Sequence, residues 1–305
     1  MIIKNYIKKF KYLSANTFYE WFCRRSSDVI ALNSWIVSHR GIVKCRNFGD
    51  ELNVHLLSKL TGKTILDYNS YFHRPFTNYM VIGSILDGFT DSKSVVWGSG
   101  LLSDKEPLKK KPAKVCAVRG KITRDYLLAN GVECPEVYGD PALLMPYIYN
   151  PRVEKTFKIG VIPHIRDIVN PQITEFVANN SEEVCLIDFS QYNDWHDVID
   201  EICSCNYIIS SSLHGLILAD AYGIPNLWIS VSDKVKGVDC KFADYFSGVG
   251  REFVSAMNFV ADIDVSELCG KMSGYIPPTY NSLKLVEACP FEIVPQFKNL
   301  FVEKK

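Results

Sequence analysis

The chain has no long hydrophobic run and no net charge. No apolar stretch in its 305 residues approaches the ~20 residues that a membrane-spanning helix needs. The 34 basic and 34 acidic side chains cancel, so no global field favours nucleic acid, and any basic surface has to be local. The composition therefore predicts a protein that is soluble or peripheral to a membrane and that does not bind nucleic acid.

The common glycine-rich and nucleophile motifs are also missing. Gly98-Ser99-Gly100 lacks the third glycine of a dinucleotide-binding loop, and Gly120-Lys121-Ile122-Thr123 lacks the upstream glycine of a phosphate-binding loop. No Gly-x-Ser-x-Gly elbow occurs. These absences argue against dehydrogenases, kinases and hydrolases of those types.

The ten cysteines have neither a secretory signal before them nor the spacing of a zinc site. The closest pair, Cys203 and Cys205, is separated by a single residue, and no second Cys/His pair stands at zinc-ligand spacing. Scattered cysteines without a signal peptide are typical of a reducing cytosol. We therefore predict a cytoplasmic protein without a metal site.

Residues 1–27 predict a basic amphipathic helix. Its apolar residues at near-helical spacing are Ile2, Ile3, Tyr6, Ile7, Phe10 and Leu13, and its lysines are Lys4, Lys8, Lys9 and Lys11. Such a helix suits peripheral contact of residues 1–25 with the inner face of an anionic membrane. It equally suits packing against a domain with its lysines in water, so both interpretations stay open.

Two series of apolar runs, separated by a polar stretch, predict two α/β domains. The runs are continuous rather than alternating, which is typical of strands covered on both faces of a parallel sheet. The predicted division is a first α/β domain at 28–145, a linker at 146–157, a second α/β domain at 158–282 and a tail at 283–305 that packs back on the domains.

The expected elements follow from these runs and from the turn residues between them. Strands are expected within 36–43, 79–86, 94–100, 115–120, from 158 onward, and within 183–188, 207–210, 226–229 and 252–254. Helices are expected at 52–60, 121–130, 172–179, 195–203, 216–222 and 243–246.

The segment 205–225 is the most informative part of the chain. It predicts a short strand, a polar turn that carries His214, an apolar helix and a Gly-x-Pro exit into the next strand. In an open α/β sheet, ligands bind at the carboxyl ends of the strands, and the first turn of the following helix offers free N–H groups to an anion. His214 is therefore predicted to lie at an anion-binding site.

Four short motifs occur in a fixed order across the two halves: Asn47-Phe48-Gly49-Asp50, the run from Val118 to Arg124, Gly139-Asp140-Pro141 and Ser212-Leu213-His214-Gly215. With this arrangement over residues 40–230, the chain resembles the polysaccharide pyruvyl transferase family. Members of that family transfer the enolpyruvyl-derived group of phosphoenolpyruvate (PEP) to a sugar as a ketal. The resemblance implies a fold like the GT-B glycosyltransferases, with two Rossmann-like domains, an interdomain cleft and the donor bound mainly by the second domain.

A PEP site needs at least one bidentate guanidinium and helix-terminal N–H groups, because PEP carries a carboxylate and a phosphate on one small frame. The candidate donor-binding residues are Arg166, His164, Ser212, Leu213 and Gly215. In some relatives an arginine stands at the position of Ser212, so the second cationic contact is unassigned here. Its candidates are Arg166, His164 and Lys234.

Ketal formation needs an acid for the methylene carbon and a base for the acceptor hydroxyl. His214 is the predicted acid, or a donor to the phosphate, because an imidazole pKa of about 6.5 is easily tuned across neutrality. Asp50 is predicted to orient or deprotonate the acceptor hydroxyl, with an N-cap role as the equal alternative. The acceptor-side candidates are Asn47, Gly49 and Arg119, whereas Asp140 is interpreted as a turn-former.

The predicted function is a PEP-dependent pyruvyltransferase that acts on the lipid-linked precursor of a surface polysaccharide such as a capsule or exopolysaccharide. The resemblance makes galactose the expected sugar. PEP is a co-substrate, so no cofactor is predicted. Two alternatives stay open: a GT-B glycosyltransferase that uses a nucleotide sugar, and a non-catalytic relative that binds a glycan or an anion.

Overall fold

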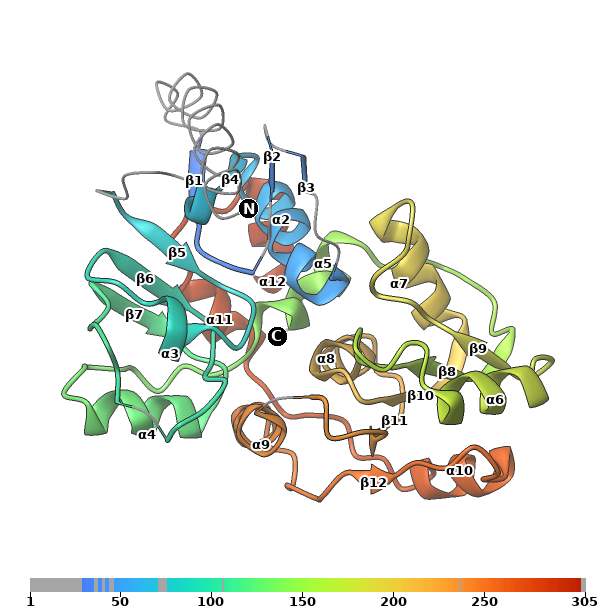
Figure 1. The fold of residues 1–305 in the computed structure, drawn as a ribbon. Helices are drawn as coiled ribbons and strands as arrows, with labels where there is room; N and C mark the ends of the chain where they lie inside the picture. The colour runs from blue at the N-terminus through green and yellow to red at the C-terminus, as the bar shows by residue number, and fades with distance from the viewer. Residues whose placement is uncertain are drawn as a thin grey trace, which may run out of the picture.

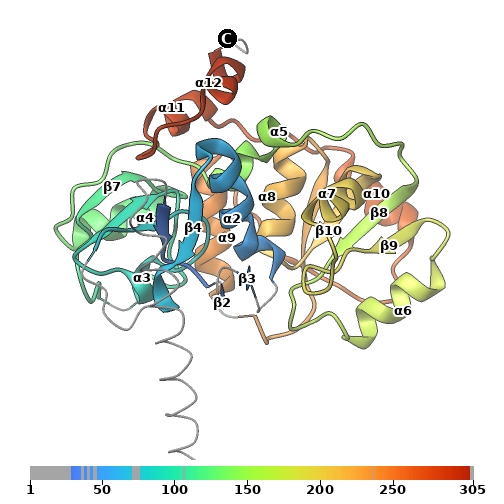
Figure 2. The same cartoon turned by 90° about the horizontal axis from the view of Figure 1, so that it is seen from above.

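The computed structural model describes residues 29–35, 38–39, 42–43, 47–70, 76–105, 107–235 and 237–302. The predicted basic helix at 1–27 lies outside these residues. The described chain forms two parallel sheets of five strands each, as in Rossmann-like α/β proteins (Figure 1). In the two views of Figures 1 and 2, the helices α2, α8 and α9 lie between the sheets.

The first sheet has the strand order β4-β1-β5-β6-β7. Its strands are β1 (Val29–Leu32), β4 (Thr64–Asp67), β5 (Asn78–Met80), β6 (Ser94–Trp97) and β7 (Lys114–Ala117). Its helices are α2 (Phe48–Thr61), η1 (Tyr68–Ser70), α3 (Leu86–Phe89) and α4 (Lys121–Ala129). The expected parallel pairing is confirmed between all neighbouring strands.

The predicted first strand at 36–43 is wrong. The described residues of that range form a separate antiparallel pair, β2 (Ser38–His39) and β3 (Ile42–Val43), and the sheet begins with β1 instead. A short apolar run looks the same whether it forms one strand or the two arms of a hairpin, so periodicity did not separate the two cases.

The second sheet has the order β12-β11-β10-β8-β9. Its strands are β8 (Phe157–Ile162), β9 (Val184–Leu186), β10 (Cys205–Ser210), β11 (Asn226–Ser230) and β12 (Met257–Asn258). In both sheets the second strand along the chain lies outside the first, and the third lies on its other side. The order in which successive strands are added to the second sheet therefore reverses between β8 and β10, and ligands bind at such a point in α/β sheets.

The helices of the second half are α6 (Pro171–Asn179), α7 (Trp195–Cys203), α8 (Leu213–Ala221), α9 (Val238–Gly248) and α10 (Val265–Met272). The helix predicted at 243–246 is the second half of the longer α9. The strand predicted at 252–254 is wrong, because those residues have no regular structure and the edge strand is β12. Their apolar side chains, Phe253 and Val254, are exposed and do not enter a sheet.

The segment that connects the two halves lies against both, and the end of the chain packs on this segment and on the first half. Between the halves come η2 (Pro141–Leu144) and α5 (Met145–Ile148), and the chain ends with α11 (Ser282–Glu287) and α12 (Pro295–Val302). The tail returns to the first half, where the Val294 N–H donates to the Leu60 carbonyl at 2.9 Å and Trp97 Nε1 donates to the Leu285 carbonyl at 2.8 Å. Within the described residues, no helix has both the length and the apolar character to cross a bilayer.

Candidate functional site

The first turn of α2 forms one wall of the site. The helix begins at Phe48 rather than at 52, so the motif that opens it is helical, and Asn47 rather than Asp50 is its N-cap. Asn47 Nδ2 donates to Asp50 Oδ2 at 2.7 Å and holds that carboxyl. Burial raises the pKa of Asp50 to about 6, although the bond from Asn47 and the charge of Lys241 oppose the rise. Asp50 is therefore a stronger base than an ordinary aspartate.

His214 lies directly against this turn. Helix α8 begins at Leu213, three residues earlier than expected, so His214 belongs to its first turn. The imidazole packs on Gly49, where an added Cβ would lie 2.0 Å from His214 Nδ1. His214 Nε2 is buried and has no hydrogen-bond partner in the part of the chain that the structure describes.

The surroundings of His214 disfavour its charged form. Burial, together with the positive charges of Arg119 and Lys241, lowers the pKa of His214 to about 3. The imidazole is therefore uncharged at neutral pH in the ligand-free protein. An anion that offsets those two charges would raise the pKa again.

The contact between Gly49 and His214 gives a sharp test. We expect Gly49→Ala to lower turnover by about 10- to 100-fold, because its methyl group displaces the imidazole from its place and misplaced reactive groups lose rate steeply. Gly270 in α10 is the matched control, since a Cβ there meets nothing within 4 Å. Gly270→Ala is expected to keep full turnover. Steady-state kinetics of the two variants check this, and full activity of Gly49→Ala would contradict it.

His164 and Arg166 follow β8, on the other side of the reversal point. The His164 N–H donates to Ser211 Oγ at 2.9 Å, and the Arg166 N–H donates to His164 Nδ1 at 3.2 Å. The ring proton of neutral His164 therefore sits on Nε2. Burial and the charges of Lys241 and Arg166 lower the pKa of His164 to about 4. The exposed Arg166 guanidinium donates to the Lys234 carbonyl at 2.9 Å, so the Lys234 backbone rather than its ammonium makes the contact.

The N-terminus of α8 is open to an anion. The N-cap Ser212 makes no side-chain cap bond, and within the described ranges no acceptor bonds the N–H of Leu213 or His214. The Leu213 side chain is buried in the core, so only its backbone faces the site. Gly215 allows close packing, because a Cβ there would lie 2.3 Å from Ser210 Oγ.

Lys241 completes the site and was missed from the sequence. Its side chain is 7% exposed, and among the described residues no carboxylate forms an ion pair with it. Burial lowers the pKa of Lys241 to about 8, partly offset by Asp50. The charge of Lys241 in turn lowers the pKa of Asp50, His164 and His214, so it acts on all three groups of the site. The one available signal was a lysine on the apolar face of α9, and that helix was predicted too short.

Two further sequence candidates have structural partners. Arg119 is fully buried, and its guanidinium bonds to Asp244, Ser84 and the Leu101 carbonyl rather than lying open toward an acceptor. Asp140 is the N-cap of η2, where its Oδ1 accepts from the Ala142 N–H at 3.0 Å, as expected of a turn-former. Burial raises the pKa of Asp140 to about 7. In the described ranges no group of three or more His, Cys, Asp or Glu side chains is placed to hold a metal ion.

One protein family and two known proteins are similar to this chain. A model of the family described as polysaccharide pyruvyl transferase matches residues 47–233, which include the α2 turn, His164, Arg166 and His214. An uncharacterised protein of Acanthamoeba polyphaga mimivirus is 31% identical over 222 residues, which cover 69% of this chain and 73% of that protein. A functionally uncharacterised protein of Klebsiella pneumoniae has a solved structure that aligns with a TM-score of 0.40 at 13% identity, covering 78% of this chain and 97% of that one. From the extent of the family match and the viral relative, the chain belongs to the polysaccharide pyruvyl transferase family.

Proposed function

We propose that this protein transfers the pyruvyl group of PEP to a sugar of a polysaccharide precursor as a ketal. One observation carries the choice of donor: the buried Lys241 has no ion-pair partner among the described residues, and its charge acts on His164 and on His214 in the first turn of α8. Asp50 is the carboxylate that acts on Lys241, so the charges of Lys241 and Arg166 exceed the negative charge near them. A site of this kind suits a small ligand with several negative charges.

The donor groups have natural partners in this arrangement. The Arg166 guanidinium suits the bidentate recognition of a carboxylate, whereas the Lys241 ammonium and the free N–H groups of Leu213 and His214 suit a phosphate. Lys241 thus fills the cationic position that Ser212 leaves empty. His164 Nε2–H is a further donor to the same ligand.

Each step of the reaction has a group to serve it. His214, its pKa raised by the bound phosphate, donates a proton to the methylene carbon of PEP, which leaves an oxocarbenium-like centre at the next carbon. Asp50 takes the proton of the acceptor hydroxyl that attacks this centre. The carbon–oxygen bond to phosphate breaks, and a second hydroxyl closes the ketal. Of the two hydroxyl protons, one ends on the new methyl group and one on inorganic phosphate.

We extend the proposal to the acceptor and to the arrangement of the two halves. The facing positions of α2 and α8 support a GT-B-like architecture in which the acceptor enters from the side of Asp50 and the donor from the side of Lys241. A lipid-linked, galactose-containing precursor at the inner face of the membrane is the proposed acceptor.

Incubation with PEP and a galactose-containing acceptor tests this function. We expect phosphate release that depends on both substrates, and an acceptor whose mass increases by one pyruvyl ketal. A nucleotide sugar offered in place of PEP should release no nucleotide. Release of nucleotide without consumption of PEP would replace the proposal with a glycosyltransferase.

The pKa shifts predict that PEP binding takes up protons. In the free protein the pKa values of His214 and His164 lie at about 3 and about 4, so both rings are neutral at pH 7. The negative ligand offsets the charges of Arg119 and Lys241 and so raises the pKa of His214, whose ring then takes a proton from the buffer. The affinity for PEP should therefore fall as the pH rises through the pKa values of the bound state. Calorimetry in buffers of different ionisation enthalpy measures the uptake, and release of protons would contradict the proposal.

A further inference from the structure

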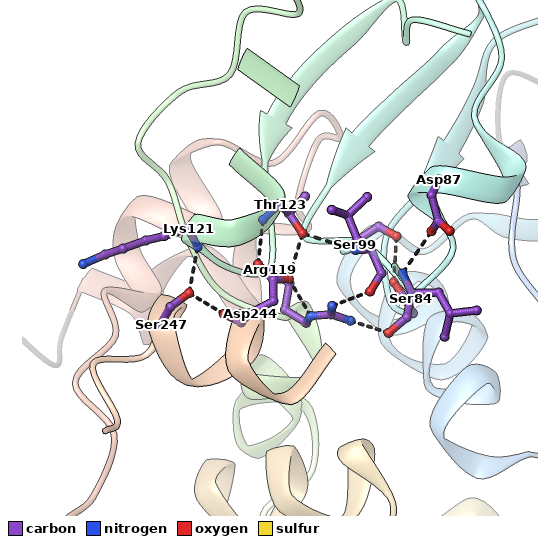
Figure 3. Close-up of polar contacts among 11 residues, drawn as sticks. Ser84, Asp87, Ser99, Arg119, Lys121, Thr123, Asp244 and Ser247 are labelled. Carbon is purple, nitrogen blue, oxygen red and sulfur yellow. Dashed lines mark hydrogen bonds and ion pairs between the residues drawn. The ribbon is translucent and has the colours of Figure 1, made fainter. Parts of the chain in front are cut away.

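Helix α9 of the second half docks on the start of α4 in the first half (Figure 3). The N-cap of α4 is Gly120, which has no side chain to satisfy the free N–H groups of the first turn. Two residues of α9 supply the missing acceptors: Asp244 Oδ1 accepts from the Thr123 N–H at 2.8 Å, and Ser247 Oγ accepts from the Lys121 N–H at 2.9 Å. The cap of α4 therefore comes from a helix more than a hundred residues later.

A buried ion pair joins the same two segments. Arg119 Nε donates to Asp244 Oδ2 at 2.9 Å, and both side chains are fully buried. Thr123 Oγ1 donates to the same oxygen at 2.7 Å. The guanidinium also donates to the Leu101 carbonyl at 2.8 Å and to Ser84 Oγ, so it reaches the segments that follow β6 and β5. Through Arg119, which Figure 3 shows between Asp244 and Ser84, Asp244 thus connects α9 to three segments of the first half.

Two glycines bring the backbones into direct contact at this junction. A Cβ on Gly120 would lie 1.7 Å from the Asp244 carbonyl oxygen, and a Cβ on Gly248 would lie 2.1 Å from the Arg119 carbonyl oxygen. Because the nearest atom is a backbone oxygen in both cases, neither position has room for a side chain. The position of α9 on the first sheet is therefore closely defined.

Lys241 lies one helical turn before Asp244, on the same face of α9. We propose that Arg119 and Asp244 are positioning residues for the donor site: their ion pair clamps α9 to the first sheet and thereby sets the position of the Lys241 ammonium relative to Asp50 on α2 and His214 on α8. The inference rests on the proposed function, since Lys241 is taken as a PEP contact. A buried pair that does not touch the substrate thus controls the affinity for PEP.

A double-mutant cycle tests this coupling. Asp244→Asn removes the negative charge of the pair and leaves that of Arg119. We expect it to raise the KM for PEP at least ~10-fold, with a smaller effect on kcat. In the background of Lys241→Met, the same substitution should change the KM less than ~2-fold, because the group it positions is already gone. Additive effects on KM, or a loss of active protein with the KM unchanged, would overturn the proposal.

Two further variants keep the result interpretable. Thr123→Val is the milder variant, to be used if Asp244→Asn folds poorly. It removes one bond to Asp244 but leaves the ion pair, so it should raise the KM for PEP by a smaller factor. Arg251→Met is the matched control, since it breaks a second ion pair to a buried carboxylate, Arg251 Nη1 to Asp220 Oδ2 at 2.7 Å. It should lower the Tm and leave the KM for PEP unchanged. If the wild type does not turn over PEP at all, the proposed function fails rather than the coupling.

Discussion

Replacing Lys241 with methionine is expected to lower kcat/KM for PEP at least ~100-fold, mainly through KM. A buried ammonium that bonds a phosphate in a dry site contributes about 1.5–3 kcal/mol, and 100-fold corresponds to about 2.7 kcal/mol. Methionine keeps most of the aliphatic volume, so packing against Phe242 and its neighbours is preserved. The variant removes a buried charge that has no ion-pair partner in the part of the chain that the structure describes, so its Tm should stay equal or rise.

Lys234→Met is the matched control for this prediction. Lys234 is exposed and reaches Arg166 through its backbone carbonyl, so the loss of its ammonium should change kcat/KM less than ~3-fold, in line with substitutions at exposed sites. Steady-state kinetics with PEP as the varied substrate compare the two variants. A large effect at Lys234 with none at Lys241 would show that the second cationic contact to PEP is Lys234 rather than Lys241.

His214→Ala is expected to lower kcat by about 100- to 10,000-fold, the range typical for loss of a general acid. His214→Gln offers a hydrogen-bond donor that cannot act as a general acid, so this variant should bind PEP but turn it over slowly. Because both variants enlarge the space beside Gly49, their Tm is measured together with their kinetics. His196→Ala, at a partly exposed imidazole paired with Asp194, is the control and should keep its rate. Near-normal turnover in both His214 variants would remove the imidazole from the mechanism.

The fold class could be predicted from local patterns. Continuous apolar runs at β8, β10 and β11 are typical of strands covered on both sides, and both parallel sheets followed from such runs. The edges of helices were predicted less well. The first turns of α2 and α8 contain glycine and polar residues, which favour turns locally, yet tertiary packing makes both segments helical.

The candidate site was only partly predictable for a related reason. His214, Asp50, Arg166 and His164 stand at strand ends or helix starts, where sequence position alone indicates a ligand. The burial of Lys241 depends on the docking of α9 on the first sheet through residues 125 positions apart. The role of Arg119 was missed in the same way, because its partner Asp244 lies on that helix. Contacts between residues so far apart in the sequence leave no local sequence pattern from which they could be predicted.

The most direct test of the account is a binding titration of the purified protein with PEP and, in parallel, with a nucleotide sugar. We expect PEP to bind and the nucleotide sugar not to displace it. We expect Lys241→Met to weaken PEP binding at least ~10-fold through the loss of a charge-assisted contact. Binding of the nucleotide sugar but not of PEP, or PEP binding that is indifferent to Lys241, would contradict it.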